Sequence, residues 1–125
     1  MSYILIVDDH SDIRRLLSIS LCKEFTVREA EDGVTALETA RHDHPKIILL
    51  DVMMPGEMDG MQVLDAIKSD PKTSGILVAM ISARAQTVDH DEARRRGADA
   101  YFIKPFSPLQ VVAPDWEKKR LHSLE

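Results

Sequence analysis

The 125-residue sequence lacks the features of several large protein classes. Its single cysteine, Cys22, excludes an intramolecular disulfide framework and a cysteine-rich zinc site. No apolar run approaches the roughly 20 residues of a membrane span, and no basic segment precedes the short apolar stretch Tyr3–Val7, so the start does not resemble a signal peptide. Basic residues number 16 against 21 acidic ones, which argues against a broad nucleic-acid-binding surface. We therefore expect a soluble, cytoplasmic protein.

The composition and length are those of one globular domain. Hydrophobic residues make up 44% and charged residues 30% of the chain, a balance that argues against wholesale disorder. We place the domain at residues 1–113, because Pro114 would break a helix that reached it. We interpret residues 114–125 as a polar C-terminal tail, whose final Leu-Glu pair resembles one left by a cloning vector. The chain is thus a stand-alone domain or one excised from a larger protein.

Short apolar runs alternate with stretches in which apolar residues recur at helical spacing. This order predicts an α/β fold with an open, doubly wound parallel sheet, since an eight-stranded barrel needs about twice the length. The predicted strands are Tyr3–Val7, Phe25–Ala30, Ile47–Leu50, Ile76–Ile81 and Ala100–Ile103. Four predicted helices each have an apolar stripe, formed by Ile13, Leu16, Leu17 and Leu21; Val34, Leu37 and Ala40; Val63, Leu64 and Ile67; and Val88 and Ala93. A fifth helix is predicted to begin at Ser107-Pro108.

Polar residues that can carry chemistry follow four of the predicted strands. They are Asp8 and Asp9 after the first strand, Asp51 after the third, Ser82 after the fourth and Lys104 after the fifth. In open α/β sheets the carboxyl ends of the strands form the ligand-binding edge, so we expect these side chains to meet there. Three neighbouring carboxylates repel one another unless a cation is present. Oxygen ligands without His or Cys favour Mg²⁺ or Mn²⁺.

The same edge is suited to an anion. Lys104 supplies a positive charge and Ser82 a hydroxyl donor. An aspartate can itself act as a nucleophile and form an acyl phosphate. We therefore predict a site that holds a phosphoryl group beside a carboxylate.

Four segments together resemble the receiver domain of two-component response regulators. The segments are ILIVDDH (4–10), IILLDVMMPGEMDG (47–60), VAMISA (78–83) and AYFIKPF (100–106). The resemblance implies a flavodoxin-like (βα)₅ fold with strand order 2-1-3-4-5. It implies that Asp51 is the phosphoacceptor and that Lys104 pairs with the phosphoryl charge. It also implies a Mg²⁺ site formed by Asp9, Asp51 and the main-chain carbonyl of Met53, with Asp8 as a partner of the metal.

The resemblance further implies a switch and a set of partners. The main-chain N–H groups of Met53 and Ala83 would bind phosphoryl oxygens, and Ser82 and Tyr101 would transmit the change to the face of the fourth helix, fifth strand and fifth helix. The phosphoryl donor would be the phosphohistidine of a sensor histidine kinase or a phosphotransfer protein. The receiver would act as a monomer or a phosphorylation-dependent dimer on an output domain or partner protein, without contacting nucleic acid or membrane.

Two positions beside the predicted phosphoacceptor tune self-hydrolysis in this family. The apolar Met53 offers no side chain to orient an attacking water, and Arg84 would screen the phosphoryl group. We therefore expect a phosphoacceptor signalling domain, not an enzyme acting on other substrates, with slow self-dephosphorylation.

Three other functions remain as alternatives. A haloacid-dehalogenase-type phosphatase would need a second acid two residues after its nucleophile, where this chain has Met53. A flavin-binding electron carrier would need a phosphate-binding loop after the first strand, where Asp8-Asp9-His10 would repel the phosphate. A phosphate-independent interaction domain would not require the acids, the serine and the lysine together.

Overall fold

The computed structural model describes residues 3–22, 25–54, 56–82 and 87–103, with only the backbone at 87–90. The strands are β1 (Tyr3–Val7), β2 (Thr26–Ala30), β3 (Ile47–Asp51), β4 (Leu77–Ser82) and β5 (Ala100–Ile103). The helices are α1 (Ser11–Leu21), α2 (Gly33–Asp43), α3 (Gly60–Ser69) and α4 (Thr87–Arg95). The expected fifth helix and tail lie outside the described residues, as do Ala83, Arg84 and Lys104.

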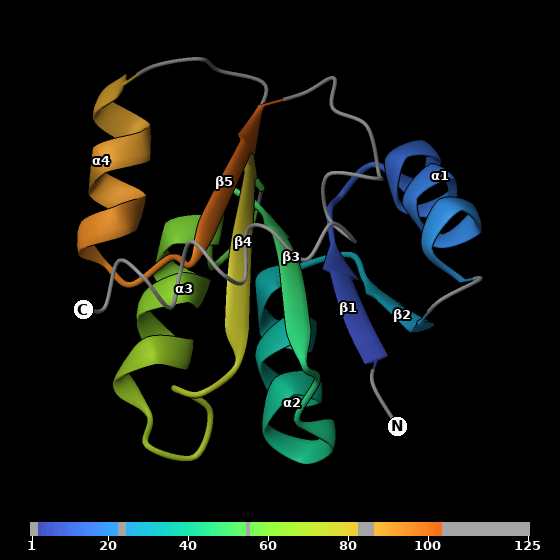
Figure 1. Ribbon diagram of the computed structural model, residues 1–125, viewed down its shortest axis with the longest axis horizontal. Coiled ribbons are helices and arrows are strands. Elements are labelled where there is room, and N and C mark those ends of the chain that lie inside the picture. Colours follow the sequence, from blue (N-terminus) through green and yellow to red (C-terminus); the bar gives the residue numbers. More distant parts are fainter. Residues whose placement is uncertain (1–2, 23–24, 55, 83–86, 104–125) are drawn as a thin grey trace.

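The strands form one parallel sheet in the order β2-β1-β3-β4-β5, which confirms the flavodoxin-like prediction. Figure 1 shows the carboxyl ends of β1, β3, β4 and β5 at the same edge of the sheet, at the top of the view. The register pairs Val7 of β1 with Leu50 of β3, and Asp51 of β3 with Ile81 of β4. The residues directly after Val7, Leu50 and Ile81, which are Asp8, Asp51 and Ser82, therefore lie side by side at this edge.

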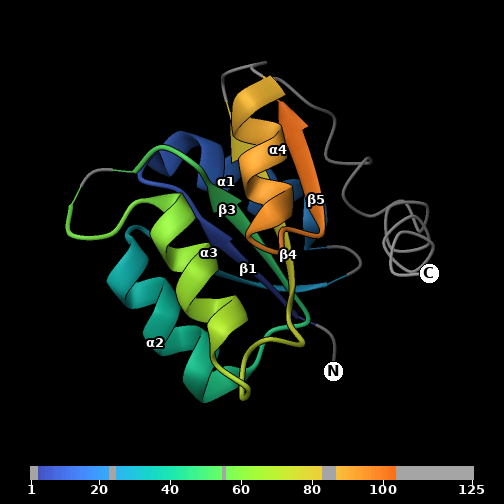
Figure 2. The ribbon, with the colours of Figure 1, turned by 90° about the vertical axis from the view of Figure 1, so that its left-hand side faces the viewer.

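The two faces of the sheet are covered by different helices. Along β1, Leu5 and Val7 pack with residues of α2 and α3, whereas Ile4 and Ile6 pack with Leu17 of α1. Strand β3 alternates in the same way, and each of its five residues is buried. Continuous apolar strands are typical of a parallel sheet with both faces covered. Figure 2 shows α2 and α3 side by side on one face.

The helices begin and end at residues whose chemistry favours those positions. Asp32 caps α2 by accepting the Thr35 N–H at 2.8 Å. Asp59 and Gln62 form a reciprocal capping box at the start of α3, with both hydrogen bonds at 2.9 Å. Gly97 follows α4 with a φ of 105°, in the left-handed region that favours glycine.

Two apolar residues of the predicted helical stripes lie on the surface instead. Leu16 of α1 is 62% exposed and Val34 of α2 is 41% exposed. Helix α1 covers the sheet with Leu17 and Leu21, four residues apart, so that Leu16 is turned away from the buried side. None of the helices in the described part of the chain has the length and apolar character needed to cross a bilayer.

Candidate functional site

Three carboxylates and one imidazole meet at the carboxyl ends of β1 and β3. One potential ligand atom from each of Asp8, Asp9, His10 and Asp51 lies within 4.8 Å of the others. We call these four residues the acidic cluster. Asp8 and Asp51 are 1% and 3% exposed, whereas Asp9 is partly exposed and His10 is exposed. The cluster thus combines two buried acids with two residues that reach solvent.

The loop after β3 holds Asp51 in place. Asp51 Oδ1 accepts a hydrogen bond from the Met53 N–H at 3.1 Å. The Val52 N–H donates to the carbonyl of Ile81 at 2.9 Å, and the Gly60 N–H donates to the carbonyl of Val52 at 3.1 Å. The backbone of Val52, directly after the candidate phosphoacceptor, is therefore tied to both β4 and the first residue of α3.

The turn after β1 holds Asp8 in a similar way. Asp8 Oδ1 accepts the His10 N–H at 2.9 Å, and the Asp8 carbonyl accepts a hydrogen bond from the Arg14 guanidinium at 2.6 Å. Arg14 is itself oriented by Glu29 on β2, 3.1 Å from its Nε. These contacts fix the turn that carries the two acids without neutralising their carboxylates directly.

The donor set of the acidic cluster fits a hard divalent cation. Asp9 Oδ1 is buried, and within the described residues no group donates a hydrogen bond to it. A buried carboxylate oxygen without a donor is costly unless a cation satisfies it. Neighbouring carboxylates also repel one another, and oxygen-rich sites of this kind are suited to Mg²⁺. Asp8, Asp9 and Asp51 are therefore suitable ligands for Mg²⁺.

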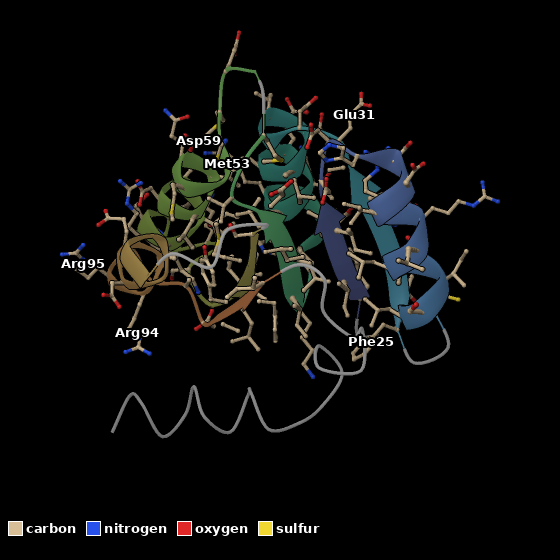
Figure 3. The ribbon with its side chains drawn as sticks, turned by 90° about the horizontal axis from the view of Figure 1, so that it is seen from above. Phe25, Glu31, Met53, Asp59, Arg94 and Arg95 are labelled. Carbon is tan, nitrogen blue, oxygen red and sulfur yellow. The ribbon has the colours of Figure 1, made fainter. Side chains whose placement is uncertain are left out.

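The other predicted site residues lie along the same edge or on the neighbouring strands. Met53 follows Asp51 with its side chain 53% exposed, and Figure 3 shows it near Asp59 at the start of α3. Ser82 is fully buried at the end of β4, in register with Ile103 of β5. Tyr101 is half-buried on β5, opposite Met80 of β4. The predicted roles of Lys104 and Ala83 fall on residues outside the described part.

One member of the cluster differs from the expectation of an oxygen-only site. The His10 ring places Nδ1 3.2 Å from Asp8 Oδ1 and 3.3 Å from Asp9 Oδ1. The structure thus brings a ring nitrogen next to the carboxylates, a neighbour that the expectation of oxygen ligands alone did not include. The only sequence signal was the position of His10 directly after the two aspartates, which does not by itself fix where the ring points.

Comparisons of sequence identify the family of the chain. The model of the family described as "Response regulator receiver domain" matches residues 4–113. Transcriptional regulatory protein SrrA of Staphylococcus aureus (strain NCTC 8325 / PS 47) is 43% identical over 110 residues, which cover 87% of this chain and 44% of SrrA. The chain thus spans less than half the length of this relative.

Comparisons of structure agree over nearly the whole chain. The chemotaxis protein CheY4 of Vibrio cholerae matches with a TM-score of 0.80 at 27% identity, covering 100% of this chain and 99% of CheY4. The BeF3-activated receiver domain of DrrB matches with a TM-score of 0.82 at 25% identity, covering 98% of each chain. The fold, the acidic edge and these matches together place the chain in the family of response regulator receiver domains of two-component systems.

Proposed function

We propose that this receiver domain accepts a phosphoryl group on Asp51 from the phosphohistidine of a sensor histidine kinase or phosphotransfer protein. The observation that carries the proposal is the convergence of the Asp8, Asp9 and Asp51 ligand atoms within 4.8 Å. Asp8, Asp9, Asp51 and the main-chain carbonyl of Met53 would hold Mg²⁺ (or Mn²⁺). When bound, the metal supplies positive charge that neutralises phosphoryl oxygens.

The residues of the chain orient the nucleophile and receive the added charge. The Met53 N–H fixes the Asp51 carboxylate through Oδ1, which favours a single direction of attack on phosphorus. The ammonium of Lys104 would pair with the phosphoryl oxygens, and the main-chain N–H groups of Met53 and Ala83 would donate to them. In phosphoryl transfer the protein contributes mainly such positioning and charge stabilisation.

Phosphorylation would switch the face formed by α4, β5 and the fifth helix. By analogy with other phospho-residues, the product carries about −1.5 to −2 charges at neutral pH. The Ser82 hydroxyl, at the end of β4, would bind a phosphoryl oxygen, and Tyr101 would change its position on β5. Among the described side chains of α4, Ala93 is the buried one. In the sequence the apolar stripe of this helix is thin, with Val88 and Ala93, and a thinly packed helix would cost little to move.

The switched face would control an output domain or a separate partner protein. The receiver would act in the cytoplasm as a monomer or a phosphorylation-dependent dimer, without contacting nucleic acid or membrane. Its chemistry would be limited to its own phosphorylation and a slow self-dephosphorylation, so it is a signalling domain and not an enzyme for other substrates.

The experiment is phosphorylation of the whole chain by acetyl phosphate and Mg²⁺, followed by intact mass measurement. We expect the wild type to gain one phosphoryl group and Asp51→Asn to gain none. Asp59→Asn is a matched control, because Asp59 follows the same strand and asparagine also caps helices. A wild type that stays unmodified, or an Asp51→Asn variant that is modified equally, would contradict the proposal.

A further inference from the structure

We propose that His10 supplies a nitrogen ligand to the cation of the acidic cluster and gives the site a preference for first-row transition-metal ions over Mg²⁺. The inference rests on the proposed metal-dependent function and specifies its ion. It concerns the one member of the cluster that is not a carboxylate.

The position of the His10 ring carries the first step of the argument. Nδ1 forms a 3.2 Å hydrogen bond with Asp8 Oδ1 and lies 3.3 Å from Asp9 Oδ1, so it faces one oxygen of each neighbouring acid. A potential ligand atom of Asp51 lies in the same 4.8 Å group. The His10 side chain is 63% exposed, which shows that the ring lies at the solvent side of the cluster. A cation between the three carboxylates would be within reach of this nitrogen.

The backbone of the turn holds the ring there. His10 is the N-cap residue of α1, with extended φ and ψ of −90° and 110°, yet its side chain makes no capping hydrogen bond. The corresponding residues of α2 and α3, Asp32 and Asp59, do cap their helices. The His10 N–H instead donates to Asp8 Oδ1 at 2.9 Å. His10 is therefore oriented toward the acids and not toward its helix.

The chemistry of the donor atoms determines for which ion His10 increases the affinity of the site. An imidazole with its proton on Nε2 presents a lone pair at Nδ1. Without a cation, Nδ1 carries the proton that is donated to Asp8 Oδ1, because an ionised carboxylate can only accept. A cation bound between the carboxylates would take the place of this proton, and Nε2 would take up a proton from solvent. Imidazole is a good ligand for Mn²⁺, Co²⁺ and Ni²⁺, in increasing order, whereas Mg²⁺ prefers oxygen and keeps its waters. A ligand at His10 would thus strengthen Ni²⁺ binding more than Mg²⁺ binding.

The experiment titrates the metal-free chain with Mg²⁺ and with Ni²⁺ by calorimetry, for wild type and His10→Asn. Asparagine keeps a polar oxygen and a favoured N-cap residue but removes the nitrogen ligand. We expect Ni²⁺ affinity to fall by at least about tenfold, the lower bound for lost partners of metal ligands, with little change for Mg²⁺. Pulsed electron paramagnetic resonance of bound Mn²⁺ should show nitrogen coupling in the wild type and none in His10→Asn.

His44→Asn is the matched control for binding to surface histidines. His44 lies at the end of α2 with a φ of 49°, a conformation that asparagine also adopts. Unchanged Ni²⁺ affinity and nitrogen coupling in His10→Asn, with Mg²⁺ still bound, would overturn this inference alone. An equal loss of Ni²⁺ binding in His44→Asn would also overturn it. A wild type that binds no divalent cation would overturn both the inference and the metal-dependent function.

Discussion

Gly60, the first residue of α3, lies directly against the backbone of Asp51. A Cβ at position 60 would overlap the Asp51 carbonyl oxygen and come within 2.7 Å of Val52 Cα. The Gly60 N–H also donates to the Val52 carbonyl at 3.1 Å. Helix α3 therefore approaches the candidate phosphoacceptor as closely as a backbone can, and the absence of a side chain makes this approach possible.

Gly60→Ala should lower both stability and Mg²⁺ affinity. The added methyl group can be accommodated only if the backbone at Asp51 and Val52 shifts, and overpacking of this kind costs about 1–3 kcal/mol. Urea denaturation and calorimetric Mg²⁺ titration would measure the two effects. Gly75→Ala is the control, because a methyl group at position 75 would meet no atom within 4 Å. If the two variants had the same free energy of unfolding and the same Mg²⁺ affinity, the close approach at Gly60 would contribute to neither.

Lys68→Met should destabilise the domain by removing an ion pair at the end of the sheet opposite to the acidic cluster. Lys68 Nζ donates to Asp99 Oδ2 at 3.0 Å and to the Ile76 carbonyl at 2.7 Å, and the side chains of Lys68 and Asp99 are only 14% and 9% exposed. Asp99 Oδ2 also accepts the Val78 N–H at 2.8 Å, so the carboxylate keeps this hydrogen bond when Lys68 is replaced. Loss of the ammonium from a largely buried ion pair should still cost about 3 kcal/mol. The measurement is the free energy of unfolding in urea.

The control for this variant is Arg41→Met. Arg41 forms a 3.8 Å ion pair with Asp70 but is 53% exposed, so its loss should cost less than about 1 kcal/mol. If Arg41→Met and Lys68→Met were equally destabilised, burial would not be the reason for the stability of the Lys68–Asp99 pair.

The sheet was predictable because its strands are simple in sequence. The run Ile47–Leu50 is apolar throughout, and its burial on both faces requires that pattern. The strand ends were harder to place. Asp51 extends β3 by one residue because it pairs in register with Ile81, a contact between segments that are distant in the sequence. Ser82 likewise belongs to β4 through its pairing with Ile103.

The acids of the site were predictable, and the imidazole was not. Asp8 and Asp9 follow β1 and Asp51 ends β3, so the parallel sheet alone brings them to one edge. The direction of the His10 ring depends on the hydrogen bond from its N–H to Asp8 and on the extended backbone of the turn. The exposure of Leu16 similarly depends on how α1 is rotated against the sheet, which a helical stripe with both Leu16 and Leu17 leaves open.

Asp9→Asn should stabilise the metal-free domain and abolish its response to Mg²⁺. Removing one carboxylate from the acidic cluster relieves repulsion with Asp8 and Asp51. It also removes the ligand whose buried Oδ1 has no hydrogen-bond donor in the described residues. In the wild type, Mg²⁺ at 100 times its dissociation constant should add about 2.7 kcal/mol. Melting temperatures with and without Mg²⁺ would measure both changes.

Asp12→Asn is the control for general charge effects, since Asp12 is an exposed acid in the first turn of α1 and outside the cluster. It should melt at nearly the wild-type temperature without Mg²⁺ and keep the Mg²⁺ response. If Asp9→Asn responded to Mg²⁺ as the wild type does, Asp9 would not be a metal ligand.

The cap of α2 should make stability depend on pH in a defined direction. The Thr35 N–H donates to Asp32 and lowers the pKa of this carboxyl below its ordinary value of 3.8. A lowered pKa in the folded state stabilises the fold above that ordinary value, and the contribution is lost as pH falls through the folded pKa. The difference in melting temperature between wild type and Asp32→Asn should therefore be largest near neutral pH and shrink below 3.8.

Glu31→Gln removes an equal charge from the adjacent exposed position, which Figure 3 labels, without touching the cap hydrogen bond. The Glu31→Gln variant therefore separates the effect of losing a negative charge on the melting temperature from the effect of losing the Asp32 cap. A difference between wild type and Asp32→Asn that stayed constant over the whole pH range would contradict the assignment of this effect to Asp32.

Met53→Gln should accelerate loss of the phosphoryl group from Asp51. The Met53 side chain is 53% exposed two residues after Asp51, where its thioether offers little to a water molecule. A glutamine amide at this position can accept a hydrogen bond from an attacking water and orient it. The decay of the phosphorylated species, followed by intact mass after removal of acetyl phosphate, should be faster than in the wild type.

Met53→Leu is the matched control, since it keeps an apolar side chain of similar size. Its phosphorylated form should decay at the wild-type rate. A wild-type lifetime of only seconds, or equal decay in Met53→Gln and Met53→Leu, would show that the side chain at position 53 does not limit hydrolysis.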